Sequence, residues 1–459
     1  MRPGARPVLL AAAVLAAAAP AASRAADLTT FGYGNARLGS TTATTITARS
    51  APRMLHVWRT DVGSAVSTQA LKVGGLLLVG EEHGSVVALR AATGKIVWRR
   101  QLGARTITGC GGSPDGIFGV TGTLVADRRA GRVYAVDARG QAWALRLRDG
   151  HPISGWPVTI HRPGPEFVWS ALSLGHGRLY VPIASVCDNG GDYRGGITSV
   201  DVQTRRVTRW ATTGGTGAYA GGIWGWGGVS IDRDGSVYAA TGNALGTDDE
   251  AAGYAEQVVR LSADLAVASS NDPLMPPFEV GDRDFGTTPT LIDAPGCGHQ
   301  LVVLNKIGEL YLYDRDDLAA GPQQRIRVAR EIGVPLYGVP AYDPATRTLV
   351  FTSPSTPAGQ SRFHQGLNAM TLTTRCRLAP RWHASFPSGA GSAPMIAGGV
   401  VFIGAGLDPY LCAYRLSDGR RLWTGTLSKA GVMAAPTVLG NTVYESDWSG
   451  GVWAFRPGG

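Results

Sequence analysis

The sequence feature that most constrains the fold is a repeated unit of two short strands joined by a glycine turn. The clearest copy spans residues 84–98, with the turn Thr93-Gly94-Lys95 in its middle and Trp98 at its end. Seven further copies follow at intervals of about 40 to 58 residues, a period typical of propeller blades. The first strands of the eight copies are residues 84–89, 141–145, 197–201, 258–261, 310–314, 367–371, 411–414 and 451–455.

A second pair of apolar strands precedes each unit. In the first copy this pair is residues 70–73 and 76–79, and in the third copy it includes residues 177–182. Glycine and proline account for 64 and 27 of the 459 residues, so turns must be frequent. Four short strands per copy, without helical periodicity, predict an all-β fold: an eight-bladed β-propeller with four antiparallel strands per blade.

The beginning of the repeat region indicates how the ring closes. Residues 56–59 form an aromatic closing strand around Trp58, with no inner strands before it. The eighth copy, residues 451–455, has inner strands but no closing tryptophan. We therefore expect the N-terminal strand to complete the last blade and leave no open edge. Residues 51–459 then form a single propeller, and residues 26–50 form a leader segment before it.

The first 25 residues have the pattern of a signal peptide. Arg2 and Arg6 precede an apolar run over residues 8–19, and Ser23-Arg24-Ala25 matches a cleavage site with small residues. The apolar run is too short to span a bilayer, and no later stretch is long enough. The sequence therefore predicts a secreted or periplasmic protein without a membrane span.

Five cysteines lie far apart, in no metal-binding or haem-attachment spacing. An exported protein can form disulfides, and neighbouring copies of the repeat hold Cys110 with Cys187 and Cys297 with Cys376. We expect these two pairs to be bonded. Cys412 lies within an apolar strand pattern, so we expect it to stay reduced as a small buried hydrophobe.

The charge pattern argues against a nucleic-acid partner. Lysine and arginine total 43 against 34 acidic residues, but the basic residues are scattered and never form a stripe. Motifs of zinc proteases, serine hydrolases, nucleotide-binding loops and dinucleotide-binding folds are absent from the sequence. Function must therefore be sought in the repeat itself.

The pattern Gly-x-Val-x-Ala followed by Thr-Gly-Lys and Trp, as in residues 84–98, resembles the tryptophan-docking repeat of the pyrroloquinoline-quinone-dependent dehydrogenases. That family consists of eight-bladed propellers, and the resemblance covers about residues 51–459. The same repeat also builds non-catalytic propellers such as the outer-membrane assembly lipoproteins. The resemblance thus implies the fold and leaves an enzyme and a binding scaffold both open.

Two segments of the fourth copy resemble the quinone site of this family. Residues 222–226, Gly-Ile-Trp-Gly-Trp, match the segment that supplies the tryptophan beneath the quinone, and Trp224 has the matching position. Residues 237–243 end at Asn243, which matches an asparagine ligand of calcium. An indole suits a flat quinone, and an amide oxygen suits a hard cation. Blade packing and a turn are the structural alternatives for these two residues.

Two segments around the fifth copy resemble the catalytic part of the family site. Residues 281–289 match the neighbourhood of the catalytic aspartate, which implies that Asp284 takes the proton of the substrate hydroxyl and lies near calcium. Lys306 matches a basic residue directed at the reactive carbonyls of the quinone. A turn before a strand and a surface turn are the alternatives.

The sequence departs from the family pattern at the metal site. The family has a calcium-binding glutamate before an Arg-Gly step, but no glutamate precedes Arg194-Gly195 here, so Asp188 or Asp192 would have to replace it. The adjacent cysteine pair that covers the quinone in many members is also missing. Residues 119–123 and the loop at residues 187–188 are similar instead to the polyvinyl-alcohol-dehydrogenase branch.

Together these features lead us to expect a secreted or periplasmic enzyme that uses pyrroloquinoline quinone and calcium. Its substrate would be a small-molecule or polymeric alcohol, and an external acceptor would receive the electrons. The alternative is a non-catalytic propeller that binds proteins or assists envelope assembly.

Overall fold

The structure is a computed structural model that describes Met1 and residues 26–109, 113–161, 164–186, 193–214, 219–245, 253–273, 282–330, 338–359, 362–387 and 391–459. The predicted signal peptide, apart from Met1, lies outside the described residues, as do Cys110, Cys187 and Asp188. Among the described residues, no helix has the length and apolar character needed to cross a membrane.

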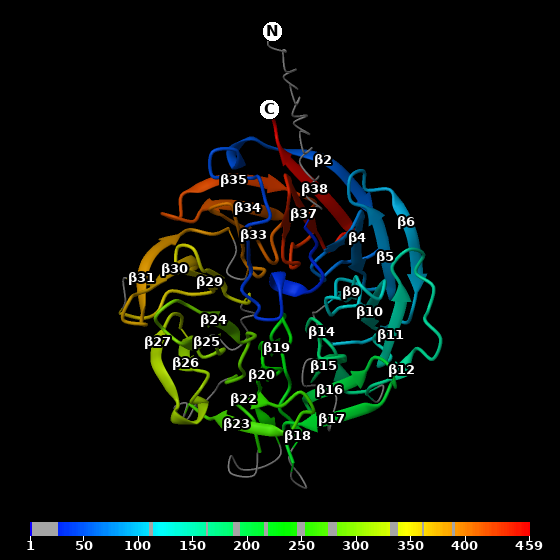
Figure 1. The fold of residues 1–459 in the computed structure, drawn as a ribbon, viewed down its shortest axis with the longest axis horizontal. Coiled ribbons are helices and arrows are strands. Elements are labelled where there is room, and N and C mark those ends of the chain that lie inside the picture. The colour runs from blue at the N-terminus through cyan, green and yellow to red at the C-terminus, as the bar shows by residue number, and fades with distance from the viewer. Residues whose placement is uncertain are drawn as a thin grey trace.

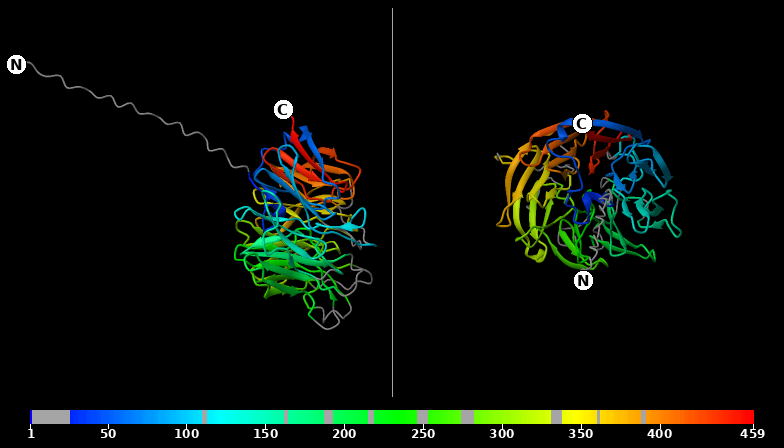
Figure 2. Two further views of the ribbon diagram at one scale, coloured as in Figure 1. Left: turned by 90° about the vertical axis from the view of Figure 1, so that its right-hand side faces the viewer. Right: turned by 45° about the horizontal axis from the view of Figure 1, so that its top comes forward.

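Eight antiparallel sheets surround one axis and form a disc (Figures 1 and 2). Blade 1 is β3 (Leu71–Val73), β4 (Leu76–Gly80), β5 (Ser85–Arg90) and β6 (Ile96–Gln101); blade 2 is β9 (Val125–Asp127), β10 (Arg132–Val136), β11 (Gln141–Arg146) and β12 (Val158–Thr159); blade 3 is β14 (Ser173–Gly175), β15 (Arg178–Ser185), β16 (Gly196–Asp201) and β17 (Val207–Ala211); blade 4 is β19 (Ser230–Ile231), β20 (Val237–Ala240), β22 (Val258–Leu261) and β23 (Val267–Asn271).

The second half of the ring repeats this arrangement. Blade 5 is β24 (Thr290–Asp293), β25 (His299–Leu304), β26 (Glu309–Asp314) and β27 (Pro322–Arg327); blade 6 is β28 (Ala341–Asp343), β29 (Thr348–Ser353), β30 (Gly366–Leu372) and β31 (Leu378–Ala384); blade 7 is β32 (Met395–Ala397), β33 (Val400–Gly404), β34 (Tyr410–Arg415) and β35 (Arg421–Thr426); blade 8 is β36 (Thr437–Leu439), β37 (Thr442–Ser446), β38 (Gly451–Pro457) and β2 (Met54–Asp61). The predicted eight-bladed propeller is confirmed.

Short elements lie outside this scheme. Strand β7 (Arg105–Thr106) pairs with β8 (Ile117–Phe118), β18 (Tyr219–Ala220) pairs with β21 (Ala244–Leu245), β13 (Glu166–Phe167) pairs with β15, and β1 (Ser40–Thr41) pairs in parallel with β32. Three 3-10 turns are η1 (Phe31–Tyr33), η2 (Ala51–Arg53) and η4 (Leu318–Ala320).

The ring closes as the sequence predicts. Strand β2 forms the outer strand of blade 8 by pairing with β38, with His56 opposite Phe455 and Asp61 opposite Gly451. The first and last parts of the propeller are thereby held in one sheet (Figure 1). The outer edge of β38 is therefore paired.

Tryptophans of outer strands pack on glycines of the next blade. The ring of Trp58 lies against Gly94, and the ring of Trp98 lies against Gly150. Both glycines have positive φ angles, 72° and 68°, and a Cβ on either would come within 2.5 Å of the indole. Trp98 Nε1 also donates to the carbonyl of Leu147 at 2.8 Å. The Thr-Gly turn of the repeat is thus a docking surface that requires glycine.

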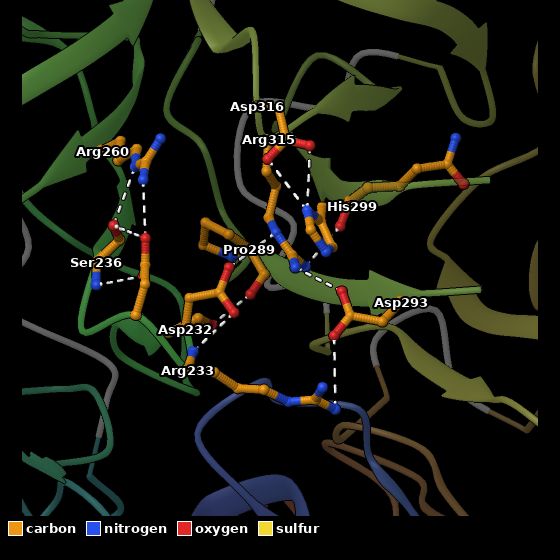
Figure 3. A network of polar contacts seen from close by, with 12 residues as sticks. Asp232, Arg233, Ser236, Arg260, Pro289, Asp293, His299, Arg315 and Asp316 are labelled. Carbon is orange, nitrogen blue, oxygen red and sulfur yellow. Dashed lines mark hydrogen bonds and ion pairs between the residues drawn. The ribbon is translucent and has the colours of Figure 1, made fainter. Parts of the chain in front are cut away.

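Blades 4 and 5, whose copies lack a closing tryptophan, are joined by buried ion pairs (Figure 3). Arg315 is 2% exposed, and its guanidinium contacts Asp293 of β24 at 2.5 Å and Asp232 of blade 4 at 3.1 Å. It also donates to the carbonyl of Gln300 at 3.0 Å. Because one buried cation is shared by carboxylates of two blades, this network fixes their relative position.

The leader runs around the axis and bonds to the inner strands of the blades (Figure 1). Its carbonyl groups accept hydrogen bonds from inner-strand amides of blades 2, 4, 5, 6 and 7, at Ala126, Ile231, Leu291, Tyr342 and Ile396. Leu28 donates to the carbonyl of Lys72 in blade 1, and Thr45 donates to that of Gly440 in blade 8. Asn35 Nδ2 donates to the carbonyl of Leu174 in blade 3, so the leader is bonded to all eight blades.

Two leader side chains fill the axis. Phe31 packs in an apolar cluster with Ala171, Val339, Ala393, Met395 and Ala435, and Trp226 packs against the cluster. Arg37 is fully buried, and its guanidinium donates to the carbonyls of Val229, Phe31 and Leu172 and to the hydroxyls of Thr30 and Ser173. Burial lowers the pKa of Arg37 to about 9.

The cysteines in the described part of the chain behave as predicted. Cys297 and Cys376 form a disulfide with a Cα separation of 5.2 Å, within the usual range. Cys412 is buried and reduced in β34. The predicted Cys110–Cys187 pair remains a prediction because both residues lie outside the described residues.

Candidate functional site

The four residues singled out from blades 4 and 5 enter one end of the propeller by the topology of their sheets. Trp224 precedes β19 and Asp284 precedes β24, whereas Asn243 follows β20 and Lys306 follows β25. In an antiparallel sheet, the start of the first strand and the end of the second lie at the same end. The blades are neighbours, so the four side chains are brought together near the axis.

Lys306 is the centre of the cluster. Its ammonium donates to Asp284 Oδ2 at 2.6 Å and to Asp282 Oδ2 at 2.6 Å, and its side chain is only 10% exposed. The ammonium also lies 5.5 Å from the centroid of the Trp224 ring, within cation–π distance. Burial opposes the charge on Lys306, but Asp284 and Asp282 outweigh it and raise the pKa of this lysine. The site therefore holds a fixed positive charge beside an indole.

Asp284 is held from both sides. Its Oδ1 accepts a hydrogen bond from the backbone N–H of Asn243 at 2.7 Å, while Oδ2 accepts from Lys306. The carbonyl of Asp284 accepts from the N–H of Lys306 at 2.8 Å. Gly242 allows this approach because a Cβ there would collide with Asp284 Oδ1. The carboxylate is thus locked between blades 4 and 5, with a lone pair left on each oxygen.

Trp224 has a buried polar atom that no described residue satisfies. Its Nε1 has no hydrogen-bond partner among the described residues. The ring is fixed by Tyr193 in an edge contact at a centroid separation of 6.4 Å. Gly222 lies so close that a Cβ would come within 2.8 Å of the indole. The indole is therefore packed tightly, and no described residue uses its N–H.

More unsatisfied polar atoms surround Trp224. Within the described part of the chain, the buried atoms without a partner include Asn243 Oδ1 and the hydroxyls of Thr212, Thr213 and Thr288. Thr212 lies against Gly221, and Thr288 lies against Gly225, both in the segment of Trp224. Buried polar groups are rarely left without partners in native proteins. The atoms near Trp224 thus leave hydrogen-bonding capacity for a polar ligand.

Asp282 was not singled out from the sequence. Burial, followed by the charge of Asp284, raises the pKa of Asp282 to about 7. Its Oδ1 accepts from the backbone N–H of Asp284 at 3.2 Å. The Asp-x-Asp spacing before Phe285 was the available signal, because residues two apart in an extended turn can hold the same cation.

The cluster of Trp224 and Lys306 suits a flat polar quinone. Trp224 offers an indole, and Lys306 places a positive charge near that ring. The buried polar atoms without a partner in the described part of the chain include Trp224 Nε1 and Asn243 Oδ1. A planar ring system with carbonyl and carboxylate oxygens could accept these hydrogen bonds.

The described residues offer few ligands for calcium. Asn243 Oδ1 is a buried unpartnered amide oxygen, a ligand type that calcium prefers. Asp284 can add a carboxylate oxygen, although both of its oxygens already accept hydrogen bonds. Among the described residues, no three His, Cys, Asp or Glu side chains are placed to hold a metal ion. Further ligands would have to come from elsewhere, and Asp188 lies outside the described residues.

Comparison with known proteins relates the chain to quinoproteins and to assembly factors. A repeat family described as "Outer membrane protein assembly factor BamB" matches residues 44–172 and 339–458, more than half of the chain. A polyvinylalcohol dehydrogenase of Pseudomonas sp is 26% identical over 467 residues, covering 87% of this chain and 69% of that protein.

Solved structures share the fold. The quinohemoprotein alcohol dehydrogenase from Comamonas testosteroni superposes with a TM-score of 0.72 at 17% identity, covering 95% of this chain and 82% of that one. BamB from Moraxella catarrhalis gives a TM-score of 0.54 at 14% identity, covering 88% of this chain and 97% of that one. At these identities the likeness extends to the propeller and not to its chemistry.

Proposed function

We propose that this chain, which belongs to the repeat family described as outer membrane protein assembly factor BamB, is a quinoprotein that oxidises an alcohol. The cofactor we propose is pyrroloquinoline quinone. The site is the cluster of Trp224, Asn243, Asp284 and Lys306. The curated relative that acts as a polyvinylalcohol dehydrogenase supports a polymeric or secondary alcohol as substrate.

The observation that carries this proposal is the pairing of Asp284 and Lys306 beside Trp224. A structural ion pair between blades does not need an indole ring 5.5 Å from its cation. The interblade network around Arg315 is a useful contrast, because its guanidinium has carboxylates of both blades and no aromatic ring is involved. The pair at Lys306 has the form expected of a ligand site.

The chemistry follows from the fixed positions of these side chains. Asp284 keeps a lone pair on each oxygen, so it can accept the proton of an alcohol hydroxyl that approaches over the site. The Asn243 N–H and the Lys306 ammonium hold this carboxylate in place, which removes the entropy cost of aligning it. The bound quinone supplies the acceptor for the hydride from the alcohol carbon.

Other side chains would bind and orient the cofactor. Trp224 would stack the face of its indole against the quinone. The Lys306 ammonium would direct its charge toward oxygens that become negative during reduction. Asn243 Oδ1 and Asp284 would face calcium, with Asp188 as a further ligand.

We further propose that the enzyme is secreted or periplasmic and passes its electrons to an external acceptor. The predicted signal peptide, residues 1–25, supports export. The Cys297–Cys376 disulfide also supports an oxidising compartment. The domain organisation proposed with it is the leader at residues 26–50 and the propeller at residues 51–459.

The alternative function is a non-catalytic scaffold for proteins or envelope assembly. The description of the matched family supports it. A scaffold, however, does not need a buried lysine and two aspartates grouped beside an indole ring. We therefore favour the enzyme.

Reconstitution separates these two functions. Purified protein is mixed with pyrroloquinoline quinone, with and without calcium, and the reduction of a dye is followed with polyvinyl alcohol and with small secondary alcohols. If the protein is this enzyme, we expect quinone-dependent dye reduction that Asp284→Asn lowers about 100-fold and that Asp316→Asn, at an exposed carboxylate, preserves. Absence of both quinone binding and dye reduction would leave the scaffold as the better account.

A further inference from the structure

We propose that Asp282 is a positioning residue that holds the Lys306 ammonium between two carboxylates and so keeps it over the cofactor site. The structure links Asp282 to both members of the reactive pair. Its Oδ1 accepts from the backbone N–H of Asp284 at 3.2 Å, and its Oδ2 accepts from Lys306 at 2.6 Å. One side chain therefore braces the backbone of the proposed base and the head of the lysine.

The need for a brace follows from the chemistry of lysine. The ammonium ends a flexible chain of four carbons and carries three equivalent donors, so one carboxylate alone does not fix its position. With Asp284 as the sole partner, the ammonium could turn around that carboxylate and occupy the lone pairs needed for the substrate hydroxyl. Asp282 supplies a second contact, so that the ammonium lies 2.6 Å from an oxygen of each acid.

The three side chains differ in their access to water. Asp284 is 4% exposed and Lys306 is 10% exposed, whereas Asp282 is 25% exposed. Asp282 thus forms the solvent side of the cluster, and Asp284 forms the deep side. Removing Asp282 opens the lysine to water without emptying the position of the base.

The neighbouring charges do not duplicate this role. Arg283, between the two aspartates, donates from Nε to Glu256 Oε1 at 3.1 Å, away from Lys306. Among the described residues, the ion pairs of Lys306 are with Asp282 and Asp284. The turn of blade 4 that contacts the cluster contributes Gly242 and Asn243, which carry no charge. Asp282 is therefore the described residue that can share the lysine with Asp284.

Two measurements test the brace, and the first does not depend on the proposed function. The chain has four lysines, Lys72, Lys95, Lys306 and Lys429, so acetylation by a water-soluble reagent can be followed at each by mass spectrometry. In Asp282→Asn we expect Lys306 to be acetylated about tenfold faster, because the neutral amide can still accept a hydrogen bond but lacks the charge that holds the ammonium. Lys95 and Lys429 serve as internal standards.

The second measurement is kinetic and rests on the proposed function. In Asp282→Asn, we expect kcat to fall about tenfold with KM for the alcohol little changed, the pattern of a lost alignment in the transition state. Quinone affinity, measured by quenching of tryptophan fluorescence, and the melting temperature should remain close to those of the wild type. Asp282→Glu, which can still reach the ammonium, should recover part of kcat, and Asp316→Asn should behave as wild type.

The outcomes keep the two ideas apart. Faster acetylation of Lys306 in a wild-type protein that neither binds quinone nor oxidises alcohols would support the brace and remove the proposed function. An active wild type with unchanged acetylation and unchanged kcat in Asp282→Asn would preserve the proposed function and overturn the brace. A lower melting temperature with proportional loss of quinone binding in Asp282→Asn, without rescue by Asp282→Glu, would also overturn it, since that result describes a structural residue.

Discussion

Two buried cations near the axis of the propeller have opposite surroundings. Arg37, in the leader, has five acceptors from carbonyl and hydroxyl groups and no carboxylate among its hydrogen-bond partners in the described residues. Lys306 has two carboxylates and lies beside an indole whose N–H no described residue satisfies. The first environment is complete without another molecule, whereas the second is not.

This difference separates a structural group from a functional one. A guanidinium whose donors all meet backbone and hydroxyl oxygens contributes to the fold and offers nothing to a ligand. A lysine between two acids, near unpartnered polar atoms, retains both charge and binding capacity. The leader therefore closes the inner ring of strands, and blades 4 and 5 supply the chemistry.

The largest expected effect concerns the leader. Arg37→Met keeps the volume of the side chain but leaves its buried acceptors without donors, and each such group costs about 1 to 3 kcal/mol. We expect the free energy of unfolding to fall by about 4 kcal/mol, measured by urea denaturation. Quinone affinity of the folded fraction should not change. If Arg37→Met had normal stability and weakened quinone binding, Arg37 would belong to the ligand site and not only to the fold.

The second effect concerns Glu82, a buried and hydrogen-bonded acid at the same turn position in blade 1 that Lys306 has in blade 5. Glu82 is the second residue of the β4–β5 turn, as Lys306 is of the β25–β26 turn, but it accepts from Ser67, Thr121 and the N–H of Gly119. Burial raises the pKa of Glu82 from 4.5 to about 7. The same turn position thus holds a hydrogen-bonded acid in blade 1.

This shift predicts how stability depends on pH. Between pH 4.5 and 7 the folded state keeps a proton on Glu82 that the unfolded state releases, so stability falls as the pH rises through this window. The loss should reach about 3 kcal/mol above pH 7, and Glu82→Gln should remove that slope. Urea midpoints at several pH values measure it. An unchanged slope in the variant would mean that Glu82 does not titrate as its burial implies.

The third effect concerns catalysis at the cluster around Lys306. Asp284→Asn removes the proposed base but keeps a side chain of the same shape, so turnover should fall about 100-fold, equivalent to about 2.7 kcal/mol. Quinone binding and melting temperature should stay close to the wild-type values. Full activity of this variant in the dye-linked assay would exclude Asp284 as the base.

The smallest effect separates two neighbouring tryptophans. Trp224→Phe loses the indole N–H and part of the stacking surface, so quinone affinity should fall about tenfold. Trp226→Phe, at the apolar cluster around Phe31, should lower stability and leave quinone affinity unchanged. Fluorescence quenching and thermal melting measure the two properties. Equal effects of both substitutions on affinity would remove the distinction between the site and the axial core.

The propeller could be predicted because its determinants are local. The turn glycines, such as Gly94, recur with the strands they join, and the Trp58 strand without inner neighbours predicted the closure on β38. The path of the leader could not be predicted in this way. Its hydrogen bonds join residues hundreds of positions apart, such as Asn35 and Ile231, and involve backbone groups that every residue has.

The grouping of the four candidate residues could be predicted, but their role as a site stays a prediction. Trp224, Asn243, Asp284 and Lys306 stood out through the family resemblance, and the structure places them together. Asp282 carried no family signal, and its importance depends on a turn that brings Oδ2 to the lysine. Asn243 contacts Asp284 through its backbone N–H, a contact that a side-chain pattern cannot reveal.

A titration of the metal-supplemented wild-type protein with pyrroloquinoline quinone tests the central claim most directly. The buried polar atoms around Trp224 are proposed to need this ligand, so the tryptophan fluorescence should be quenched to saturation at one equivalent. Trp224→Phe should weaken this binding, and Arg37→Met should not alter it in the folded fraction. No saturable quenching up to about 100 μM quinone, a concentration that detects even weak complexes, would contradict the account and favour a propeller without a cofactor.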